Sequence, residues 1–180
     1  MDNLPIRKLI RLLQYDYSRN GAYFVTFCTH KHQKMLSTIC RGDPCGRPQI
    51  QLTELGQICS QMFQKIESIH DIAITDFVIM PNHIHAIVVI LFDNVSERAT
   101  ARVAPTLGAV IGGYKSIVAN EWLKICEKRN TYMGEIWQRS YYDRIIRNHD
   151  EHARIRQYIH DNPINWAVDE YNKGDPPCQT

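Results

Sequence analysis

Apolar positions along the chain recur with the periods of strands and helices. Residues 22–29 and 73–80 are rich in β-branched and aromatic side chains, which predicts two strands. Residues 83–92 follow a Pro-Asn turn and are apolar on both faces beyond His85. A run of this kind is typical of a central strand that is covered on both sides.

Three- and four-residue spacing of apolar side chains predicts helices. One helical pattern begins at Thr53 and extends through Ile69, and a longer one covers residues 107–129. Two further helical segments are expected around residues 141–147 and 150–161. Together with the strands, these helices indicate an α+β fold with an antiparallel sheet.

The C-terminal third also contains shorter features. Residues 135–138 are a candidate for a short strand. Asp150 is expected to be the N-cap of the last helix, because a side-chain oxygen there can accept a hydrogen bond from a free backbone N–H. Asn162 and Pro163 are expected to end that helix, since proline disfavours helical geometry in the residue before it.

The segments between these elements suggest the domain organisation. Residues 37–50 are interrupted by glycine and proline and are expected to be a loop, as are residues 93–106. Residues 1–20 mix basic and apolar side chains and are expected to be a basic arm. We expect one catalytic domain over residues 21–166 and a disordered, polar tail over residues 167–180.

Composition places the chain among ordinary globular proteins. Its 180 residues suit one domain, and 44% of them are hydrophobic and 22% charged. These values exclude a disordered or coiled-coil protein. The longest apolar run, residues 86–92, is too short to span a bilayer, and the N-terminus has no secretory signal pattern. We therefore expect a cytoplasmic protein that does not bind membranes and keeps its six cysteines reduced.

Charge is distributed unevenly along the chain. The net charge is +2, but residues 1–50 carry eight Lys or Arg against three Asp or Glu. A basic N-terminal region is compatible with phosphate contacts, but charge alone favours a solvated surface as the explanation.

The sequence Met-Pro-Asn-His-Ile-His contains a candidate metal site. His83 and His85 are two residues apart on a predicted strand, so their side chains point to the same face. Two imidazoles placed in this way can bind one divalent metal ion. The alternative is that both are polar residues with local hydrogen bonds at the beginning of a strand.

The last predicted helix carries a second group of reactive side chains. Tyr158 and Asn162 are four residues apart and share one helix face, and Arg154 lies one turn earlier. A tyrosine can attack phosphorus, an asparagine oxygen can bind a hard metal ion, and an arginine can hold a phosphate. The alternative is that Tyr158 packs against the core and Asn162 caps the helix.

A third segment, residues 137–144, alternates aromatic and basic side chains. Arg139 and Arg144 lie among aromatic rings, a mixture that nucleic-acid grooves use for phosphate contact and base stacking. Tyr141 and Tyr142 in this segment are rival candidates for the nucleophile. The alternative is a short aromatic core segment.

Taken together, these segments resemble the single-tyrosine transposases of the HUH type, in particular the REP-associated tyrosine transposases. The resemblance covers about residues 15–166 and rests on five motifs in this order: Gly-Ala-Tyr-Phe-Val-Thr-Phe-Cys-Thr at 21–29, Phe-Val-Ile-Met-Pro-Asn-His-Ile-His at 77–85, Leu-Gly-x-x-Ile at 107–111 with Tyr-Lys-Ser at 114–116, Trp-Gln-Arg-Ser-Tyr-Tyr-Asp-Arg-Ile-Ile-Arg at 137–147, and Tyr-Ile-x-x-Asn-Pro at 158–163.

The resemblance implies both a fold and a reaction. The fold is a ferredoxin-like, or RRM-like, antiparallel sheet with helices on one side and the catalytic tyrosine on a late helix. The reaction is metal-dependent cleavage and strand transfer of single-stranded DNA, near a hairpin, through a 5′-phosphotyrosine intermediate. Related transposases are often dimers, and some exchange the tyrosine helix between subunits, so a homodimer is one expectation for this chain.

The family's site residues fall on specific positions of this sequence. The paired histidines of the HUH motif fall on His83 and His85, the nucleophile on Tyr158 and the polar ligand on Asn162. These three ligands would hold Mg²⁺ or Mn²⁺. DNA contacts are expected from four basic side chains: Lys115, Arg139 and Arg144 in the quoted motifs, and Arg154 one helical turn before Tyr158.

Two other functions remain open at this point. A domesticated relative could use the same sheet to bind nucleic-acid hairpins without catalysis. Alternatively, His83 and His85 could serve a metal phosphoesterase that uses water, in which case Tyr158 would be dispensable. A covalent protein–DNA adduct distinguishes among the three.

Overall fold

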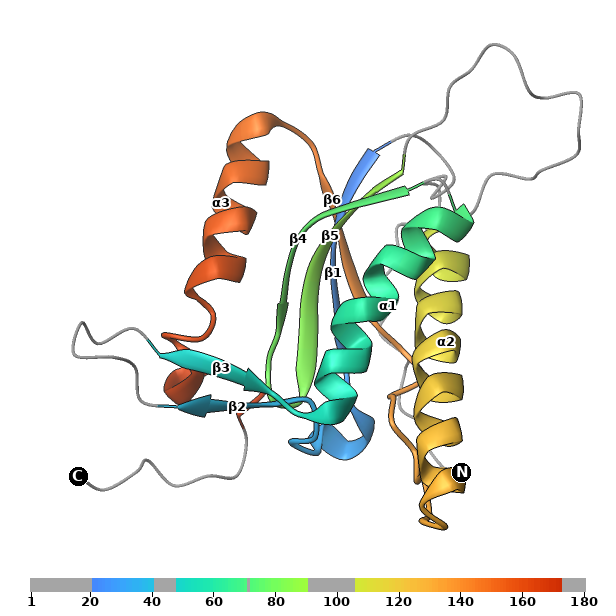
Figure 1. Ribbon diagram of the computed structural model, residues 1–180. Coiled ribbons are helices and arrows are strands. Elements are labelled where there is room, and N and C mark those ends of the chain that lie inside the picture. Colours follow the sequence, from blue (N-terminus) through green and yellow to red (C-terminus); the bar gives the residue numbers. More distant parts are fainter. Residues whose placement is uncertain (1–20, 41–47, 71, 91–105, 173–180) are drawn as a thin grey trace, which may run out of the picture.

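The computed structural model describes residues 21–40, 48–70, 72–90 and 106–172. Its centre is a four-stranded antiparallel sheet in the order β4-β5-β1-β6 (Figure 1). The strands are β1 (Gly21–Cys28), β4 (Ile72–Ile79), β5 (His83–Ile90) and β6 (Tyr142–Ile146). After β1 the chain forms a small hairpin and then helix α1 (Glu54–His70), which leads into β4. Helix α2 (Leu107–Lys128) connects β5 to β6. This order and these connections confirm the predicted α+β, ferredoxin-like fold.

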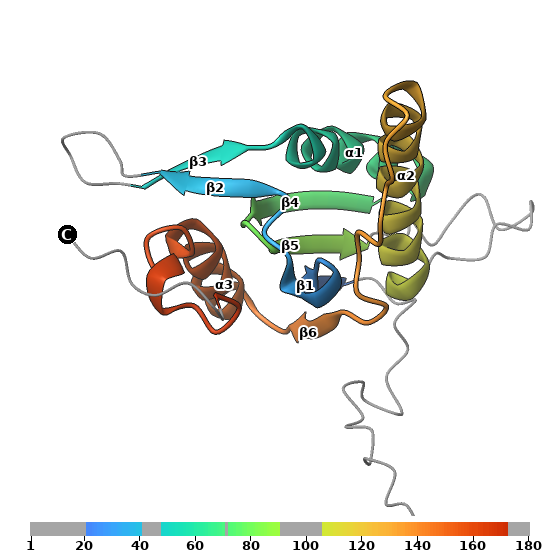
Figure 2. The ribbon, with the colours of Figure 1, turned by 90° about the horizontal axis from the view of Figure 1, so that it is seen from below.

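The helices cover both faces of the sheet. Figure 2 shows α1 and α2 on one face and α3 (His149–Asp161) on the other. The resemblance implied helices on one side only. The third helix takes the second face because that face is also apolar, with Phe24 and Ile87 packed against Ile159 of α3.

The central strands alternate between two separate cores. Ile84, Ala86 and Val88 of β5 pack into the larger core beneath α1 and α2. Ile87 belongs to the smaller core beneath α3. Successive strand residues point to opposite faces, so His83 and His85 lie on the same side as Ile87. The predicted doubly covered central strand is confirmed, and the α3 face is the one that carries both histidines.

The prediction of a helix around residues 141–147 is wrong, because this segment forms strand β6. It pairs antiparallel with β1 and places Arg144 opposite Phe24 and Tyr142 opposite Thr26. Five residues are too few to distinguish a helical period from a strand period. The segment becomes a strand because it pairs with the free edge of β1. The following helix is capped by Asn148, whose side chain accepts a hydrogen bond from the N–H of Glu151, so the predicted Asp150 cap is also wrong.

The loop expected over residues 37–50 contains two strands. β2 (Ser37–Cys40) and β3 (Gln49–Leu52) form a separate antiparallel hairpin, and residues 41–47 between them lie outside the described residues. Ile39 and Ile50 pack against the core beneath α3, which supplies the apolar contact that stabilises so short a pair. The strand expected at residues 135–138 reduces to a single bridge between Trp137 and Thr29.

Part of the expected disordered tail is folded. The 3₁₀ helix η2 covers Trp166–Val168, and the chain then turns back over the α3 face. The N–H of Tyr171 donates to Asp169 Oδ1 at 2.7 Å, and Asn82 Nδ2 donates to the Tyr171 carbonyl at 2.7 Å. These bonds place residues 169–172 beside the histidines. Residues 1–20, 93–105 and 173–180 lie outside the described part of the chain.

No helix within the described ranges is both long enough and apolar enough to cross a membrane.

Candidate active site

Strand β5 places two buried histidines side by side on the α3 face of the sheet. His83 is 0% and His85 1% exposed, and the centroids of their rings are 4.5 Å apart. Their two-residue spacing on an extended strand explains why they share this face. Because burial without partners is costly for polar rings, the hydrogen bonds of each imidazole define what its other nitrogen can do.

Asn82 fixes the orientation of His83. Its amide nitrogen donates to the backbone oxygens of His32 and Tyr171, at 3.3 and 2.7 Å. The amide oxygen therefore faces His83 and accepts a hydrogen bond from Nδ1 at 2.9 Å. With Nδ1 protonated, Nε2 of the neutral His83 ring carries the lone pair.

Thr26 plays the corresponding part for His85. It is the register partner of His85 on the neighbouring strand β1, and its Oγ1 lies 2.7 Å from Nδ1. On the other side of the ring, Nε2 lies 3.4 Å from the hydroxyl of Tyr158. Both contacts suit either tautomer of the neutral ring, and the tautomer in which Nδ1 donates to Thr26 leaves the lone pair of His85 on Nε2, where a metal ion could bind.

Helix α3 brings Tyr158 and Asn162 to the histidines. The ring of Tyr158 is half-exposed and lies 5.2 Å from the His85 ring and 6.0 Å from the Phe24 ring, measured between centroids. Asn162, the C-cap of α3, is buried. Among the described residues, neither Oδ1 of Asn162 nor Nε2 of His83 has a hydrogen-bond partner. The four residues expected from the sequence therefore meet on one face.

Burial controls the protonation of this group. It lowers the pKa of His85 to about 3. Burial, together with the neighbouring His85, also lowers the pKa of His83 well below its ordinary value, and the nearby Asn162 side chain opposes this only in part. Both imidazoles are therefore neutral at pH 7, which is the form that binds metal ions.

Tyr158 is held in its protonated form. Burial raises the pKa of its phenol, and the carboxylates of Asp169 and Glu170 raise it further, while a hydrogen bond from Asn162 acts in the opposite direction. A tyrosine in this setting is a weak nucleophile unless positive charge enters the site.

The donor set fits a divalent cation. Two neutral imidazole nitrogens and one amide oxygen converge, and two of the three, His83 Nε2 and Asn162 Oδ1, are buried polar atoms without partners in the described part of the chain. Within that part, no cluster of three or more His, Cys, Asp or Glu side chains could hold a metal ion. Asn162, whose buried Oδ1 has no partner in the described part of the chain, is the third donor expected at this site. Nitrogen and oxygen ligands of this kind suit first-row divalent metals, and the amide oxygen also suits Mg²⁺.

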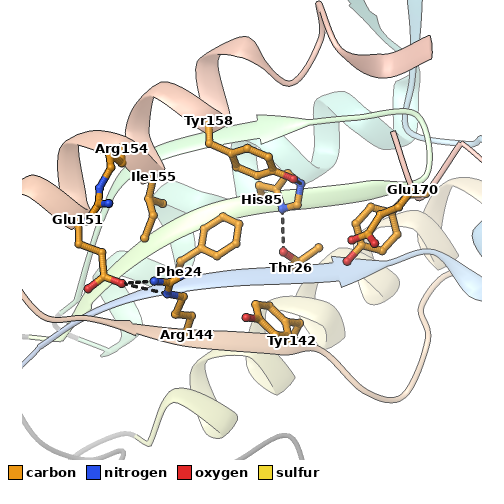
Figure 3. A pocket seen from close by; sticks show the side chains of 11 residues that line it. Phe24, Thr26, His85, Tyr142, Arg144, Glu151, Arg154, Ile155, Tyr158 and Glu170 are labelled. Carbon is orange, nitrogen blue, oxygen red and sulfur yellow. Dashed lines mark hydrogen bonds and ion pairs between the residues drawn. The ribbon is translucent and has the colours of Figure 1, made fainter. Parts of the chain in front are cut away.

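A cavity of about 530 Å³ extends from His85 along α3 (Figure 3). Its reactive end is formed by His85 and Tyr158, and Arg144 and Arg154 line the opposite end. Arg144 forms an ion pair with Glu151, with Nη2 2.6 Å from Oε1. Two of the four basic residues expected to contact DNA thus lie in the same cavity as the tyrosine.

The other two basic residues lie elsewhere. The Nζ of Lys115 donates to the backbone oxygens of Gln138 and Ser140 at 2.8 and 3.0 Å and stands 5.7 Å from the centre of the Phe27 ring. Phe27 belongs to the core beneath α1 and α2, so Lys115 is on the other face of the sheet from the histidines. Arg139 is exposed and does not line the cavity.

The structure adds residues that the sequence reasoning did not select. Asn82 and Thr26 contact the Nδ1 atoms of the two histidines, and Phe24 packs against both His85 and Tyr158. Asn82 had a signal in the sequence, because it directly precedes His83. Thr26 could have been found from strand alternation, since it is the polar residue between two core aromatics of β1. The approach of Tyr171, whose ring is 4.6 Å from that of His83, had no sequence signal.

Comparisons with known proteins bear on the family and the fold of this chain. A protein of Haemophilus influenzae strain Rd, itself uncharacterized, is 31% identical over 176 residues, covering 91% of this chain and 92% of its own length. The structure of a REP-associated tyrosine transposase bound to a REP hairpin is similar in fold, with a TM-score of 0.56 and 16% identity over 89% of this chain and 76% of that one. The family model described as "Transposase IS200 like" matches residues 18–162. With most of its length matched, this chain belongs to the IS200-like transposase family.

Proposed function

We propose that this protein cleaves and rejoins single-stranded DNA through a covalent link between Tyr158 and a 5′-phosphate. The observation that carries the proposal is the position of the Tyr158 hydroxyl, 3.4 Å from Nε2 of His85. It lies near two buried polar atoms, His83 Nε2 and Asn162 Oδ1, that have no partner among the described residues. A nucleophile and a set of metal ligands thus occupy one site. Membership of the IS200-like transposase family supports the same reaction.

The chemistry exchanges one phosphoester bond for another. The Tyr158 oxygen attacks phosphorus, a Tyr–O–P bond forms, the bond from phosphorus to the 3′-oxygen breaks, and the phenol proton is lost to solvent or to the leaving 3′-oxygen. The 3′-hydroxyl of another strand then reverses the step on the phosphotyrosine. The number of phosphoester bonds is unchanged, so strand joining needs no ATP.

The residues of the site divide this work. Thr26 and Asn82 hold the imidazoles of His85 and His83 in the tautomers that present Nε2 to the site. Phe24 and His85 pack against the Tyr158 ring and limit its movement. A cation such as Mg²⁺ or Mn²⁺, held by His83, His85 and Asn162, would supply the positive charge that polarises the scissile phosphate and favours loss of the phenol proton.

The cavity and the relatives suggest the form of the substrate. Arg154 lies one helical turn before Tyr158 and lines the cavity with Arg144, so both guanidinium groups are placed to contact the DNA strand, and that of Arg154 is the one proposed to hold a phosphate. The REP hairpin bound by the structurally similar transposase makes a hairpin-forming strand the natural first substrate to test. The contact between Tyr158 and His85 within one chain supports a site built by a single subunit, and a homodimer stays compatible with it.

The test is formation of a covalent adduct. Labelled single strands with a hairpin and randomised flanks are incubated with the protein and Mn²⁺ and resolved on an SDS gel. We expect a labelled band at the size of the protein, which is absent with EDTA and absent in Tyr158→Phe. Hairpin binding without any adduct would favour a non-catalytic binding protein. Cleavage without an adduct, unchanged in Tyr158→Phe, would favour a phosphoesterase.

A further inference from the structure

We infer that the cavity next to Tyr158 binds the base of a nucleotide adjoining the attacked phosphate, by stacking on Tyr142, and prefers guanine through Arg144. This inference rests on the proposed function and concerns the substrate of the same site. The cavity continues beyond His85 and Tyr158 toward β6, where Tyr142 and Arg144 line it. A phosphate placed at Tyr158 leaves this remaining space for the part of the strand next to it.

The wall toward β6 is flat and aromatic. Tyr142 lies on β6, the edge strand of the sheet, and its side chain is 45% exposed although it lines the cavity. Phe24, opposite Arg144 in the register of β1 and β6, forms the floor and contacts both His85 and Tyr158. An exposed ring beside an apolar floor offers a stacking surface for a nucleobase, which has an aromatic face whatever its identity.

The end of the cavity presents a fixed set of hydrogen-bond donors. Nε of Arg144 donates to Oε1 of Glu151 at 2.9 Å, and Nη2 lies 2.6 Å from the same oxygen. Oε2 of Glu151 accepts from the N–H of Arg147 at 2.9 Å, and its side chain is only 9% exposed. Glu151 therefore has both oxygens engaged, and it holds the guanidinium of Arg144 in one orientation.

One edge of that guanidinium remains available. Among the described residues, Nη1 of Arg144 has no hydrogen-bond partner, and the side chain is 58% exposed and lines the cavity. The pair of N–H groups on Nη1 and Nη2 has the spacing that matches O6 and N7 of guanine. Since the arginine is already oriented by Glu151, little rotamer freedom is lost when a base binds.

The experiment captures strands covalently from the pool with randomised flanks and sequences them around the cleaved phosphate. The wild-type protein is expected to enrich guanine at one position adjacent to that phosphate. Tyr142→Ala is expected to form the adduct but to lose this enrichment, whereas Tyr142→Phe, which keeps the ring, retains it. Tyr132→Ala is the matched control, because Tyr132 is 94% exposed and does not line the cavity.

Two further measurements separate stacking from base recognition. An abasic site at the enriched position should slow adduct formation about tenfold or more in the wild-type protein and much less in Tyr142→Ala. The double variant Arg144→Gln/Glu151→Gln removes both charges together, so that no buried carboxylate is left unpaired. It should accept all four bases at that position while still rejecting the abasic strand.

Three outcomes would overturn the inference. Adducts with no base preference next to the cleaved phosphate would do so, as would a preference that persists in Tyr142→Ala. Adduct formation that is unaffected by the abasic site but slowed by a methylphosphonate at the same nucleotide would show that the cavity binds the DNA backbone rather than a base. In all three the adduct still forms, so the proposed function stands. Absence of any wild-type adduct would instead overturn the proposed function and this inference with it.

Discussion

The hydroxyl of Tyr158 and Nε2 of His85 lie 3.4 Å apart although 73 positions separate the two residues in the sequence. In the tautomer whose Nδ1 donates to Thr26, Nε2 carries the one lone pair that the ring offers to a donor or a metal ion. The hydrogen bond from the phenol and a bond to a metal ion therefore exclude one another at this nitrogen. The contact links the state of the nucleophile directly to the occupancy of the metal site.

Replacing Tyr158 by Phe should abolish the covalent adduct without disturbing the fold. The ring and its contacts with Phe24 and His85 are kept, and the lost hydrogen bond is long, so the free energy of unfolding should change by less than about 1 kcal/mol. Mn²⁺ affinity should be unchanged or higher, because the phenol no longer competes for Nε2. Adduct trapping, urea unfolding and Mn²⁺ titration measure the three effects.

The two rival tyrosines provide the control for this variant. Tyr141→Phe and Tyr142→Phe should keep the adduct, because neither residue is the one in contact with His85. Mass spectrometry of the nucleotide-bearing peptide should identify Tyr158. An adduct mapped to Tyr141 or Tyr142, or one that persists in Tyr158→Phe, would move the nucleophile to the segment at 137–144.

His83→Ala should lower the cleavage rate by orders of magnitude and leave hairpin affinity nearly unchanged. The metal ion would act mainly on the transition state, whereas Arg154 in the cavity would provide affinity for the DNA backbone. Asn162→Ala should behave similarly, and Asn165→Ala is its control because Asn165 is exposed and bonded only to backbone. Affinity and cleavage that fall by the same factor would show that His83 is structural.

Thr26→Val should weaken metal binding about 10- to 100-fold although the valine fills the same space. The variant removes the partner of His85 Nδ1, so the ring is no longer confined to the tautomer with a free Nε2. Thr26→Ser, which keeps the hydroxyl, should restore binding. Mn²⁺ titration gives the affinity and ¹⁵N NMR of the imidazole gives the tautomer. Equal affinity in all three proteins would mean that Thr26 has no part in orienting His85.

Lys115→Met should affect stability more than DNA binding. Its ammonium holds two backbone oxygens beside residues 138–140, and burial lowers its pKa to about 8. Loss of these bonds should cost about 1–3 kcal/mol in urea unfolding. Arg154→Gln should instead reduce DNA affinity and its dependence on salt, with little change in stability. A large loss of DNA affinity in Lys115→Met at unchanged stability would restore the role expected from the sequence.

The spacing of apolar residues correctly predicted the longer strands and helices, each of which buries a continuous apolar face. The strands at 22–29, 73–80 and 83–92 and the helix at 107–129 were found because each has enough residues for its period to be visible. Strand β6 was missed because its identity depends on pairing with β1, which no local pattern shows. The β2–β3 hairpin was hidden by the glycines and prolines between its strands.

The candidate site could be predicted only in part for a related reason. His83 and His85 share a face through strand geometry alone, but their approach to Tyr158 depends on which face α3 covers. The sequence prediction that Tyr158 lies beside the histidines came from the resemblance to the family, not from residue spacing. The role of Lys115 could not be read from its charge, because the backbone oxygens that it binds belong to a segment more than twenty residues away.

The two histidines should also make the stability of the metal-free protein depend on pH. In the folded chain burial lowers the pKa of His85 to about 3 and that of His83 well below its ordinary value, whereas in the unfolded chain both titrate near pH 6.5. Below about pH 6.5 the unfolded chain therefore binds protons that the folded chain does not, and the free energy of unfolding must fall as the pH falls. Each histidine can contribute up to about 1.4 kcal/mol per pH unit. Urea unfolding between pH 7.5 and pH 5 should show this decline in the wild-type protein and a flatter profile in His83→Gln/His85→Gln. Profiles of equal slope would show that the imidazoles are not neutral and buried in solution, and the assignment of both Nε2 atoms as free lone pairs would then fail.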